Sequence, residues 1–174
     1  MELLIFEHME KRFSASLSIT SWIISAAVLL FTVVMTWILF SDLADSGAPE
    51  WLVWAFPVFM SGTIVGLFLY RPSAYMITPY SVVISRPAKD KVIDRKEIAL
   101  CRVVSKEEMG LPIRTFGNGG LFGFTGKFFS DRLGKMQWYC TRTDNYVLLQ
   151  LANGTRLIIT PDEPQAFVNA LLQP

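Results

Sequence analysis

The fold of this chain is decided by an uncharged apolar stretch, Leu17–Phe40, which reads LSITSWIISAAVLLFTVVMTWILF. A second uncharged stretch, Trp51–Tyr70, reads WLVWAFPVFMSGTIVGLFLY. An α-helix rises about 1.5 Å per residue, so each stretch can cross a hydrocarbon core about 30 Å thick. The two stretches therefore predict a transmembrane hairpin whose ends emerge on the same side of the membrane.

Length and composition favour a small membrane protein with one further domain. The chain has 174 residues, 52% of them hydrophobic, and a mean hydropathy of +0.38. About 100 residues follow the hairpin, enough for one compact domain. The chain is expected to divide into a cytoplasmic N-terminal lead at 1–16, a first span at 17–40, an external loop at 41–50, a second span at 51–70 and a cytoplasmic domain at 71–174.

The distribution of basic residues predicts the orientation of the hairpin. Lys11 and Arg12 precede the first stretch and Arg71 follows the second, whereas the connector Ser41–Glu50 contains no Lys or Arg. Positively charged flanks stay in the cytoplasm, so both termini are expected there. The lead contains Leu3, Leu4, Ile5, Phe6, Met9 and Phe13, and it is interpreted as either a short interfacial amphipathic helix or a flexible tail.

Small residues in the second stretch indicate close helix packing. Ser61, Gly62 and Gly66 form a small-residue stripe of the G-x-x-x-G type. The stripe is expected to pack either against the first stretch or against a second copy of the chain. The first stretch offers a matching small face made of Ser21, Ser25, Ala26 and Ala27. Neither stretch contains an ionisable residue, which argues against an ion or proton pathway.

Beyond Arg71 the pattern becomes that of half-buried strands, with apolar residues at alternate positions in Tyr80–Arg86, Val147–Leu151 and Leu157–Ile159. Asn153-Gly154 predicts a type I′ turn. The prolines and acids of Thr160–Pro164 predict the start of a last helix. Its apolar stripe, expected to cover an open end of the sheet, consists of Phe167, Val168, Leu171 and Leu172.

Three stretches with these residues, Tyr75–Thr78, Arg114–Phe128 and Thr160–Phe167, resemble the bacterial pleckstrin-homology (PH)-like domain in its membrane-anchored form. The resemblance covers about residues 75–172. It implies a bent antiparallel sheet of about seven strands in two layers, capped by a C-terminal helix, in a multi-pass protein of the bacterial inner membrane. It implies no reaction and transfers no catalytic residues.

The glycine-rich run Gly117–Gly126 does not fit a nucleotide-binding loop. Gly126-Lys127 is followed by Phe128 rather than Ser or Thr, and the glycine spacing fits neither a P-loop nor a dinucleotide fingerprint. The run is interpreted as a wide hairpin or a bulged loop that needs positive φ angles and close backbone approach. Its apolar side chains either return to the core or contact the bilayer or a protein partner. The candidate contact residues are Arg114, Phe116, Leu121, Phe122, Phe124 and Phe128.

A basic segment near the second stretch is the candidate site for anionic lipid. Arg86, Lys89 and Lys91 carry the charge, and each such residue near an anionic leaflet contributes about 1 kcal/mol. Interleaved acids, Asp90 and Asp94, weaken this interpretation. The alternative is a solvated hairpin whose charges help to set the topology.

Other chemistry is excluded by residue counts. The only histidine, His8, precedes the first stretch, so the domain offers no catalytic triad, and neither a metal nor a cofactor is expected. Cys101 and Cys140 are expected to be buried thiols in a reducing compartment. From Arg71 onward 14 basic and 9 acidic residues give only +5, which argues against nucleic acid.

The sequence therefore predicts a non-enzymatic, membrane-anchored binding or scaffold module. Its PH-like domain is expected to engage a protein partner at the membrane surface. The alternatives are anionic-lipid sensing through residues 86–96 and a structural subunit, or homo-oligomer, packed through the second stretch.

Overall fold

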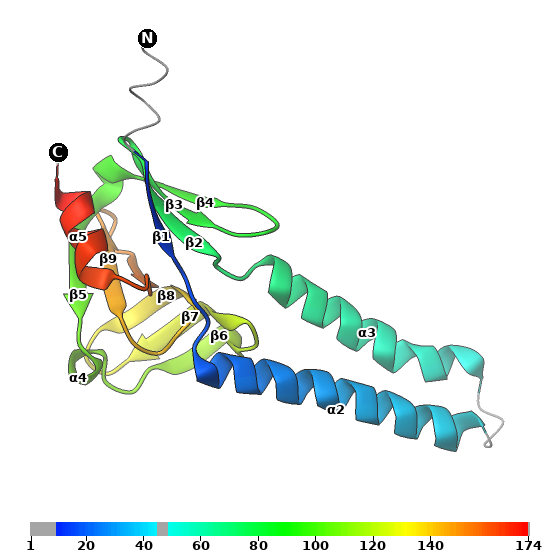
Figure 1. Ribbon diagram of the computed structural model, residues 1–174. Coiled ribbons are helices and arrows are strands. Elements are labelled where there is room, and N and C mark those ends of the chain that lie inside the picture. The colour runs from blue at the N-terminus through cyan, green and yellow to red at the C-terminus, as the bar shows by residue number, and fades with distance from the viewer. Residues whose placement is uncertain (1–9, 45–48, 174) are drawn as a thin grey trace, which may run out of the picture.

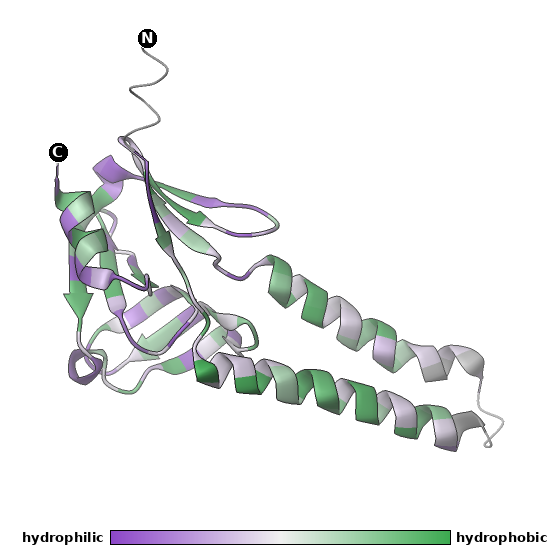
Figure 2. Ribbon diagram, viewed as in Figure 1, coloured by the Kyte–Doolittle hydropathy of each residue, from purple (hydrophilic) through white to green (hydrophobic). Residues whose placement is uncertain are grey.

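The computed structural model describes residues 10–44 and 49–173, and it shows two long helices that extend side by side from a β domain (Figure 1). The helices are α2, Ile19–Ala44, and α3, Glu50–Leu69. Hydrophobic residues follow both helices along most of their length (Figure 2). Both apolar stretches are therefore helical.

The two helices differ in apolar length. The segment Ile19–Asp42 is the one described helix long and apolar enough to cross a membrane, and the described apolar part of α3, Trp54–Leu69, is shorter. Helix α2 continues through Ser41–Ala44, where the sequence predicts a loop. The rest of that predicted loop, apart from Pro49 and the first residue of α3, lies outside the described residues.

Four antiparallel strands form the first sheet, in the order β1-β2-β3-β4. They are β1, Lys11–Ser14, β2, Ala74–Ile77, β3, Ser81–Ser85, and β4, Lys91–Asp94. Tyr75 and Ile77 alternate with the half-buried Met76, as expected for a strand with one face in a core, whereas Val82, Val83 and Ile84 of β3 are all buried between two half-buried serines.

Strand β1 corrects the interpretation of the N-terminal lead. Residues 11–14 form neither an amphipathic helix nor a tail, because they pair with β2, with Lys11 opposite Ile77. Phe13 meets the ring of Phe167 at 5.2 Å between centroids. Residues 1–9, which include the other apolar positions of the lead and His8, lie outside the described residues. Helices α2 and α3 are consequently inserted between two neighbouring strands of one sheet.

The second sheet is larger and strongly bent, and its strand order is β5-β9-β10-β8-β7-β6. The strands are β5, Ile98–Val104, β6, Ile113–Gly120, β7, Gly123–Ser130, β8, Gly134–Cys140, β9, Tyr146–Leu151, and β10, Arg156–Ile159. Strands β8 and β10 pair in parallel. A 3₁₀ turn at Arg95–Glu97 precedes β5, and a short helix α4, Lys106–Met109, follows it. Nine of the ten strands in the described residues, β2 to β10, belong to the part that the resemblance covers, more than the approximately seven that it implied.

The main core lies between the two sheets and is covered by helix α5, Pro164–Leu172. Tyr75, fully buried, donates from its hydroxyl to the carbonyl of Tyr139 at 2.6 Å and accepts from the amide of Thr160. Phe167, Val168 and Leu171 are buried, which confirms the predicted stripe. Leu172 was placed in that stripe wrongly, because it is 67% exposed.

A second core occupies the opposite face of the bent sheet. The indole of Trp138 stacks on Phe128 at 4.3 Å between centroids, and Met109 of α4 covers this cluster. Cys101 lies in the first core and Cys140 in the second, and both thiols are free and buried, as predicted. Burial raises the pKa of the Cys101 thiol to about 12 and also raises that of Cys140. These groups are packing residues rather than nucleophiles.

The turn between β9 and β10 is not of type I′. That turn needs positive φ at both central residues, and only Gly154, with φ +83°, has it. The Leu151 amide bonds to the Thr155 carbonyl at 2.8 Å, and the Gly154 amide bonds to the Leu151 carbonyl. This is a three-residue loop with a glycine bulge.

Candidate functional site

The glycine-rich run is the hairpin formed by β6 and β7. Gly117 and Gly126 lie opposite each other, and a Cβ on either would stand 2.3 or 2.2 Å from a backbone oxygen of the other strand. Glycine is required here because the backbones approach so closely. The hairpin, its positive φ angles and its close backbone approach are as predicted, and the pairing register shifts just before the glycine-rich run, between Arg114 and Phe116.

The turn of this hairpin packs against the bases of both long helices. The amide of Phe122 donates to the hydroxyl of Ser25 at 3.0 Å, and its ring meets Phe68 of α3 edge-on at 5.4 Å. Leu121 is buried beneath it. A Cβ on Gly120 would stand 2.7 Å from Ile24. Leu121 and Phe122 are therefore committed to packing within the chain rather than exposed to a partner.

Two further candidate residues also point inward. Phe128 is 5% exposed and stacks on Trp138, and Phe124 packs on the same indole at 6.4 Å between centroids. The glycine-rich run thus supplies both the joint with the helices and part of the second core. The remaining two candidates, Arg114 and Phe116, are exposed.

The exposed part of the hairpin lies at the edge of the large sheet, because β6 is its last strand. Ile113 lies opposite Phe129, and Phe116 lies opposite Lys127, so these side chains share one face. Four large apolar side chains are exposed by between 42 and 83% here, and we call them the apolar edge: Leu111, Ile113, Phe116 and Phe129.

Sequence reasoning missed Leu111 and Ile113. They precede the glycine-rich run, and nothing in their own pattern marks them as exposed. The available signal was the run Leu111–Phe116, in which Leu111 follows Gly110 and Phe116 precedes Gly117, glycines that have no side chain to cover them. Only the strand order shows that, within residues 10–44 and 49–173, no further strand lies beside Ile113.

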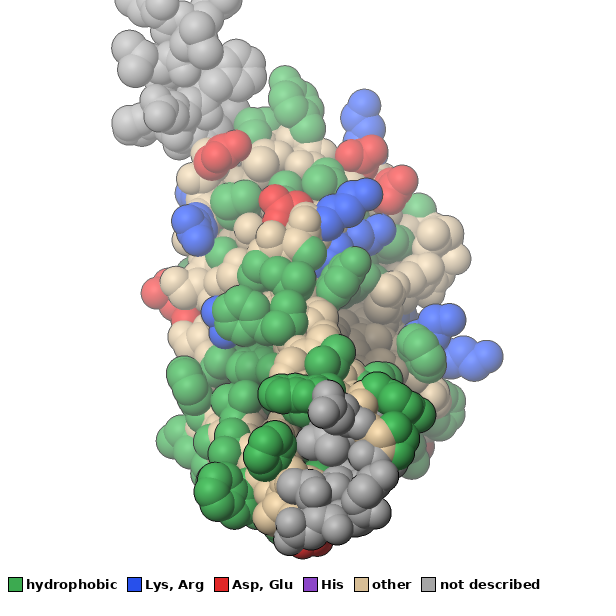
Figure 3. Space-filling model, turned by 90° about the vertical axis from the view of Figure 1, so that its right-hand side faces the viewer, with side chains coloured by type: hydrophobic (Ala, Val, Ile, Leu, Met, Phe, Trp, Pro, Cys, Tyr) green, Lys and Arg blue, Asp and Glu red, His purple; other side chains and the backbone are tan. Residues whose placement is uncertain are grey.

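The basic segment near the second helix is a loop beside the end of α3. The amide of Ala88 donates to the carbonyl of Leu69 at 2.9 Å. Arg86 lies over the rings of Tyr70 and Tyr139, at 5.6 and 5.7 Å, while Lys89 and Lys91 are exposed. Seen toward the free ends of the helices, the domain shows basic and acidic side chains mixed around the apolar helices (Figure 3).

The small-residue stripe of α3 does not pack on α2. A Cβ on Gly62 or Gly66 would have no atom within 4 Å. Only Ser61 faces the first helix, where it lines a hollow of about 400 Å³ between the helices. The small face predicted on the first helix makes other contacts. The Ser21 hydroxyl donates to the carbonyl of Thr141, and the Ser25 hydroxyl accepts from the amide of Phe122. The prediction that the glycines pack on the first helix is therefore wrong.

The described residues hold no group of three or more His, Cys, Asp or Glu side chains that could bind a metal ion. What they do hold is an exposed sheet edge, a basic loop and a joint between helices and hairpin.

Two packed β-sheets closed by a C-terminal helix define a PH-like binding domain as the class of this protein. The family model of the bacterial PH domain matches residues 73–174, more than half of the chain, and the protein belongs to this family. No match was found among curated proteins or among solved structures. Strand β1 lies outside the matched residues. It precedes both helices in the chain and completes the first sheet by pairing with β2, which follows them.

Proposed function

We propose that this protein is a non-enzymatic scaffold, anchored in the bacterial inner membrane, whose apolar edge binds a protein partner. The observation that carries the proposal is the outer edge of strand β6, which carries the exposed side chains of Ile113 and Phe116 and has no further strand beside it within the described residues. Sheet edges normally carry charged side chains or are covered by a helix or loop, because they otherwise pair with other chains. An extended segment of a partner could add a strand to β6 through backbone hydrogen bonds.

The anchor has two supports. Large apolar side chains are exposed along both helices, among them Trp22 at 62%, Trp37 at 76% and Phe59 at 71%. A surface of this size and kind needs lipid around it. Helix α3 is 20 residues long, about 30 Å, which is the thickness of the hydrocarbon core.

The sheet supports a proposed topology of the anchor. Helix α2 follows β1 and helix α3 precedes β2, and these two strands are neighbours in one sheet, which favours an arrangement in which the two helix ends that join the domain lie on one side of the bilayer. Lys11, Arg12 and Arg71 lie at those ends, and Lys89 is exposed in the loop beside α3. A cytoplasmic domain agrees with this distribution of charge.

Charge changes at the edge test the proposal. The protein is purified from native membranes as wild type, as Ile113→Lys with Phe116→Lys, and as Val92→Lys. Val92 is the matched control, because it is a 55% exposed apolar residue on the other sheet's edge strand β4. A specific partner should be lost from the double variant and kept by the control. Equal recovery in all three samples would contradict the proposal.

Anionic-lipid contact through the basic loop is the second candidate. It is favoured by the hydrogen bond between Ala88 and Leu69, which holds Lys89 and Lys91 beside the end of α3. The backbone amide of Arg86 already engages Asp90 at 2.9 Å, which reduces the repulsion of anions. In liposomes, Lys89→Gln with Lys91→Gln should weaken the preference for anionic over neutral lipid. An unchanged preference would remove this candidate.

Assembly through the second helix remains a prediction. The open space beside Gly62 and Gly66 leaves room for another helix. Gly62→Leu with Gly66→Leu should then reduce the size of the detergent-extracted particle to that of one chain. The measurement is light scattering, and a size that equals the wild type would contradict assembly by this face.

A further inference from the structure

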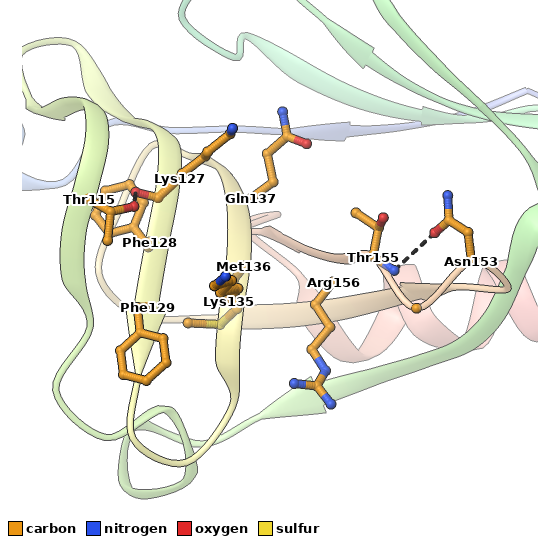
Figure 4. Close-up of a pocket in the computed structure, with 11 residues that line it drawn as sticks. Thr115, Lys127, Phe128, Phe129, Lys135, Met136, Gln137, Asn153, Thr155 and Arg156 are labelled. Carbon is orange, nitrogen blue, oxygen red and sulfur yellow. Dashed lines mark hydrogen bonds between the residues drawn. The ribbon is translucent and has the colours of Figure 1, made fainter.

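The larger of two hollows in the β domain does not gather its polar side chains around one point. It measures about 620 Å³ and lies between β7, β8 and the turn from β9 to β10 (Figure 4). Lys127 and Gln137 extend from one face of the bent sheet, whereas Arg156 belongs to the opposite face. The smaller hollow is different, because one strand edge and one helix end form its two walls.

This smaller hollow is a cleft of about 270 Å³ between β5 and the end of α5. Four consecutive residues of β5, Ile98–Cys101, line one side, and Leu171 and Leu172 of α5 line the other. Consecutive side chains of a strand point to opposite faces, so the wall that β5 supplies is the edge of the strand itself. A volume below about 300 Å³ is small for a complete small molecule and suits the side chains of a peptide.

The edge of the sheet at this cleft is open and apolar. Strand β5 is the last strand of the large sheet at the end opposite β6, and no further strand pairs with it within the described residues. Leu172 is 67% exposed on the α5 side of the edge. Leu100, on the face of β5 opposite to the core residue Cys101, is 42% exposed. An open edge with these side chains favours pairing with a further segment of chain.

The start of β1 lies beside the cleft. The ammonium of Lys11 donates to the side-chain oxygen of Gln173 at 3.3 Å. The guanidinium of Arg95, which lines the cleft, donates to the carbonyls of Leu171 and Gln173 at 2.5 and 2.8 Å. The chain that precedes Lys11 therefore enters the fold next to the end of α5 and the edge of β5.

The residues that precede β1 have a composition that matches this edge. Leu3-Leu4-Ile5-Phe6 is a run of four large apolar residues. In an added strand, two of them would face each side. The edge of β5 is apolar on both sides in the same way, with Leu172 on one and Leu100 on the other.

The length and charge of the connection also fit. Residues 7–10 separate the apolar run from Lys11, and a hairpin connection needs about 2–5 residues. The acids Glu2 and Glu7 flank the run. Opposite charges are available beside the cleft, because Lys96 is exposed next to Arg95 and Lys11 is exposed as well.

We propose that residues 3–6 of this chain bind in the cleft and add a strand to the open edge of β5. The segment would cover one edge of the large sheet and leave β6 as the edge that remains open in the same sheet. The proposal rests on the cleft and on the place where the chain enters it, and it does not depend on a protein partner at β6.

The position of Lys11 favours the cleft over the bilayer as the binding place of this segment. Helix α2 begins at Ile19, beyond the other end of β1, whereas Lys11 lies at the end of α5. Up to about 26 Å of extended chain separates Lys11 from Ile19, at about 3.3 Å per residue. The cleft is therefore nearer to the segment than the helices are.

The test uses the full-length protein in native membranes, with a photoreactive phenylalanine analogue in place of Leu172. Irradiation should join position 172 to the peptide 1–11, which trypsin releases by cleavage after Lys11, and mass spectrometry identifies the adduct. The matched control carries the analogue in place of Gln165, an exposed residue of the same helix outside the cleft. The yield of the adduct should be at least tenfold higher from position 172.

Other results overturn the proposal. No adduct between position 172 and residues 1–11, or equal yields from both positions, would show that the segment does not bind in the cleft. An adduct of twice the mass of the chain would show that the occupant comes from a second copy. An adduct with lipid or with another protein, in place of residues 1–11, would assign the cleft to that occupant instead.

Substitutions in the segment give a second readout. Leu4→Asp with Phe6→Asp should lower the yield of the adduct at least tenfold and accelerate amide hydrogen exchange at residues 98–101 by a similar factor. The matched control, Leu4→Val with Phe6→Leu, keeps the segment apolar and should change both by less than twofold. Unchanged exchange in the aspartate variant would contradict an added strand. Exchange at residues 113–116 of β6 should stay the same in both variants, so this result does not decide whether β6 binds a protein.

Discussion

Both ends of the β6–β7 hairpin carry large apolar side chains, but their surroundings are opposite. At the turn, Phe122 is held by Ser25 of α2 and Phe68 of α3. At the open end, Ile113 and Phe116 are 65 and 74% exposed. The comparison teaches that apolar and aromatic content alone does not distinguish an internal joint from a binding surface. The neighbouring elements decide which it becomes.

The difference has an energetic consequence. At the turn, the burial of apolar area is already complete, so it stabilises the position of the domain on the helices. At the open end, each large side chain could still gain about 1.5–3 kcal/mol when a partner covers it. Only the open end can therefore supply binding free energy to another molecule.

A substitution in the middle of the hairpin, between its turn and its open end, should cause the largest loss in the free energy of unfolding. In Gly126→Val the new Cβ would lie 2.2 Å from the carbonyl oxygen of Phe116, at a φ of +130°. We expect a loss of about 3–5 kcal/mol in the free energy of unfolding, because both strain and collision act there. Thermal unfolding of the full chain in nanodiscs measures it.

The control for that variant is Gly154→Ala. Gly154 also has positive φ, +83°, but a Cβ there meets nothing within 4 Å. Its cost should be about 1 kcal/mol, from the backbone conformation alone. Equal losses in the two variants would show that the close approach of β6 and β7 contributes nothing.

Truncating one aromatic ring at each end compares the ends directly. Phe122→Ala removes the edge-on contact with Phe68 and should lower the free energy of unfolding by about 1–3 kcal/mol. Phe116→Ala should change it by no more than about 0.5 kcal/mol, because that ring is exposed. Amide hydrogen exchange at residues 120–123 should accelerate in the first variant alone. Acceleration in both would contradict the distinction between the ends.

The smallest expected effect concerns pH at α4, the short helix that precedes β6 in the chain. Glu108 of α4 pairs with Arg102, and this hydrogen bond lowers the pKa of the Glu108 carboxyl below its ordinary value. The pair therefore stabilises the fold above that ordinary value, and the contribution is lost as the pH falls through the lowered pKa. Both side chains are more than a third exposed, so the contribution stays below about 1 kcal/mol.

Glu108→Gln isolates this contribution. Unfolding temperatures of the wild type and the variant should differ at neutral pH and converge in acid. A constant difference across the pH range would show that the carboxylate charge is not the source of the stabilisation.

Much of the fold could be predicted, because it depends on local pattern. Alternation in Tyr146–Leu151 and Arg156–Ile159 predicted the strands, and the stripe from Phe167 to Leu171 predicted α5. The resemblance added two layers and a closing helix, and the family match confirms that the chain belongs to the bacterial PH-domain family.

The rest depended on distant contacts. Strand β1 escaped notice because Lys11–Ser14 holds one large apolar residue and pairs with residues 74–77 across both helices. The inward turn of Phe122 depends on Ser25, almost 100 residues earlier in the chain. The exposure of Ile113 depends on the absence of a strand beside β6 in the described sheet. None of these relations leaves a periodic signal.

Site-specific photo-crosslinking in native membranes tests most directly whether the apolar edge binds a protein. A photoreactive phenylalanine analogue replaces Phe116 in one variant and Val92, on the edge strand β4 of the other sheet, in another. Our account predicts a discrete crosslinked band from position 116, identified as one protein by mass spectrometry, and none from position 92. No adduct at 116, or the same adducts at both positions, would contradict the account.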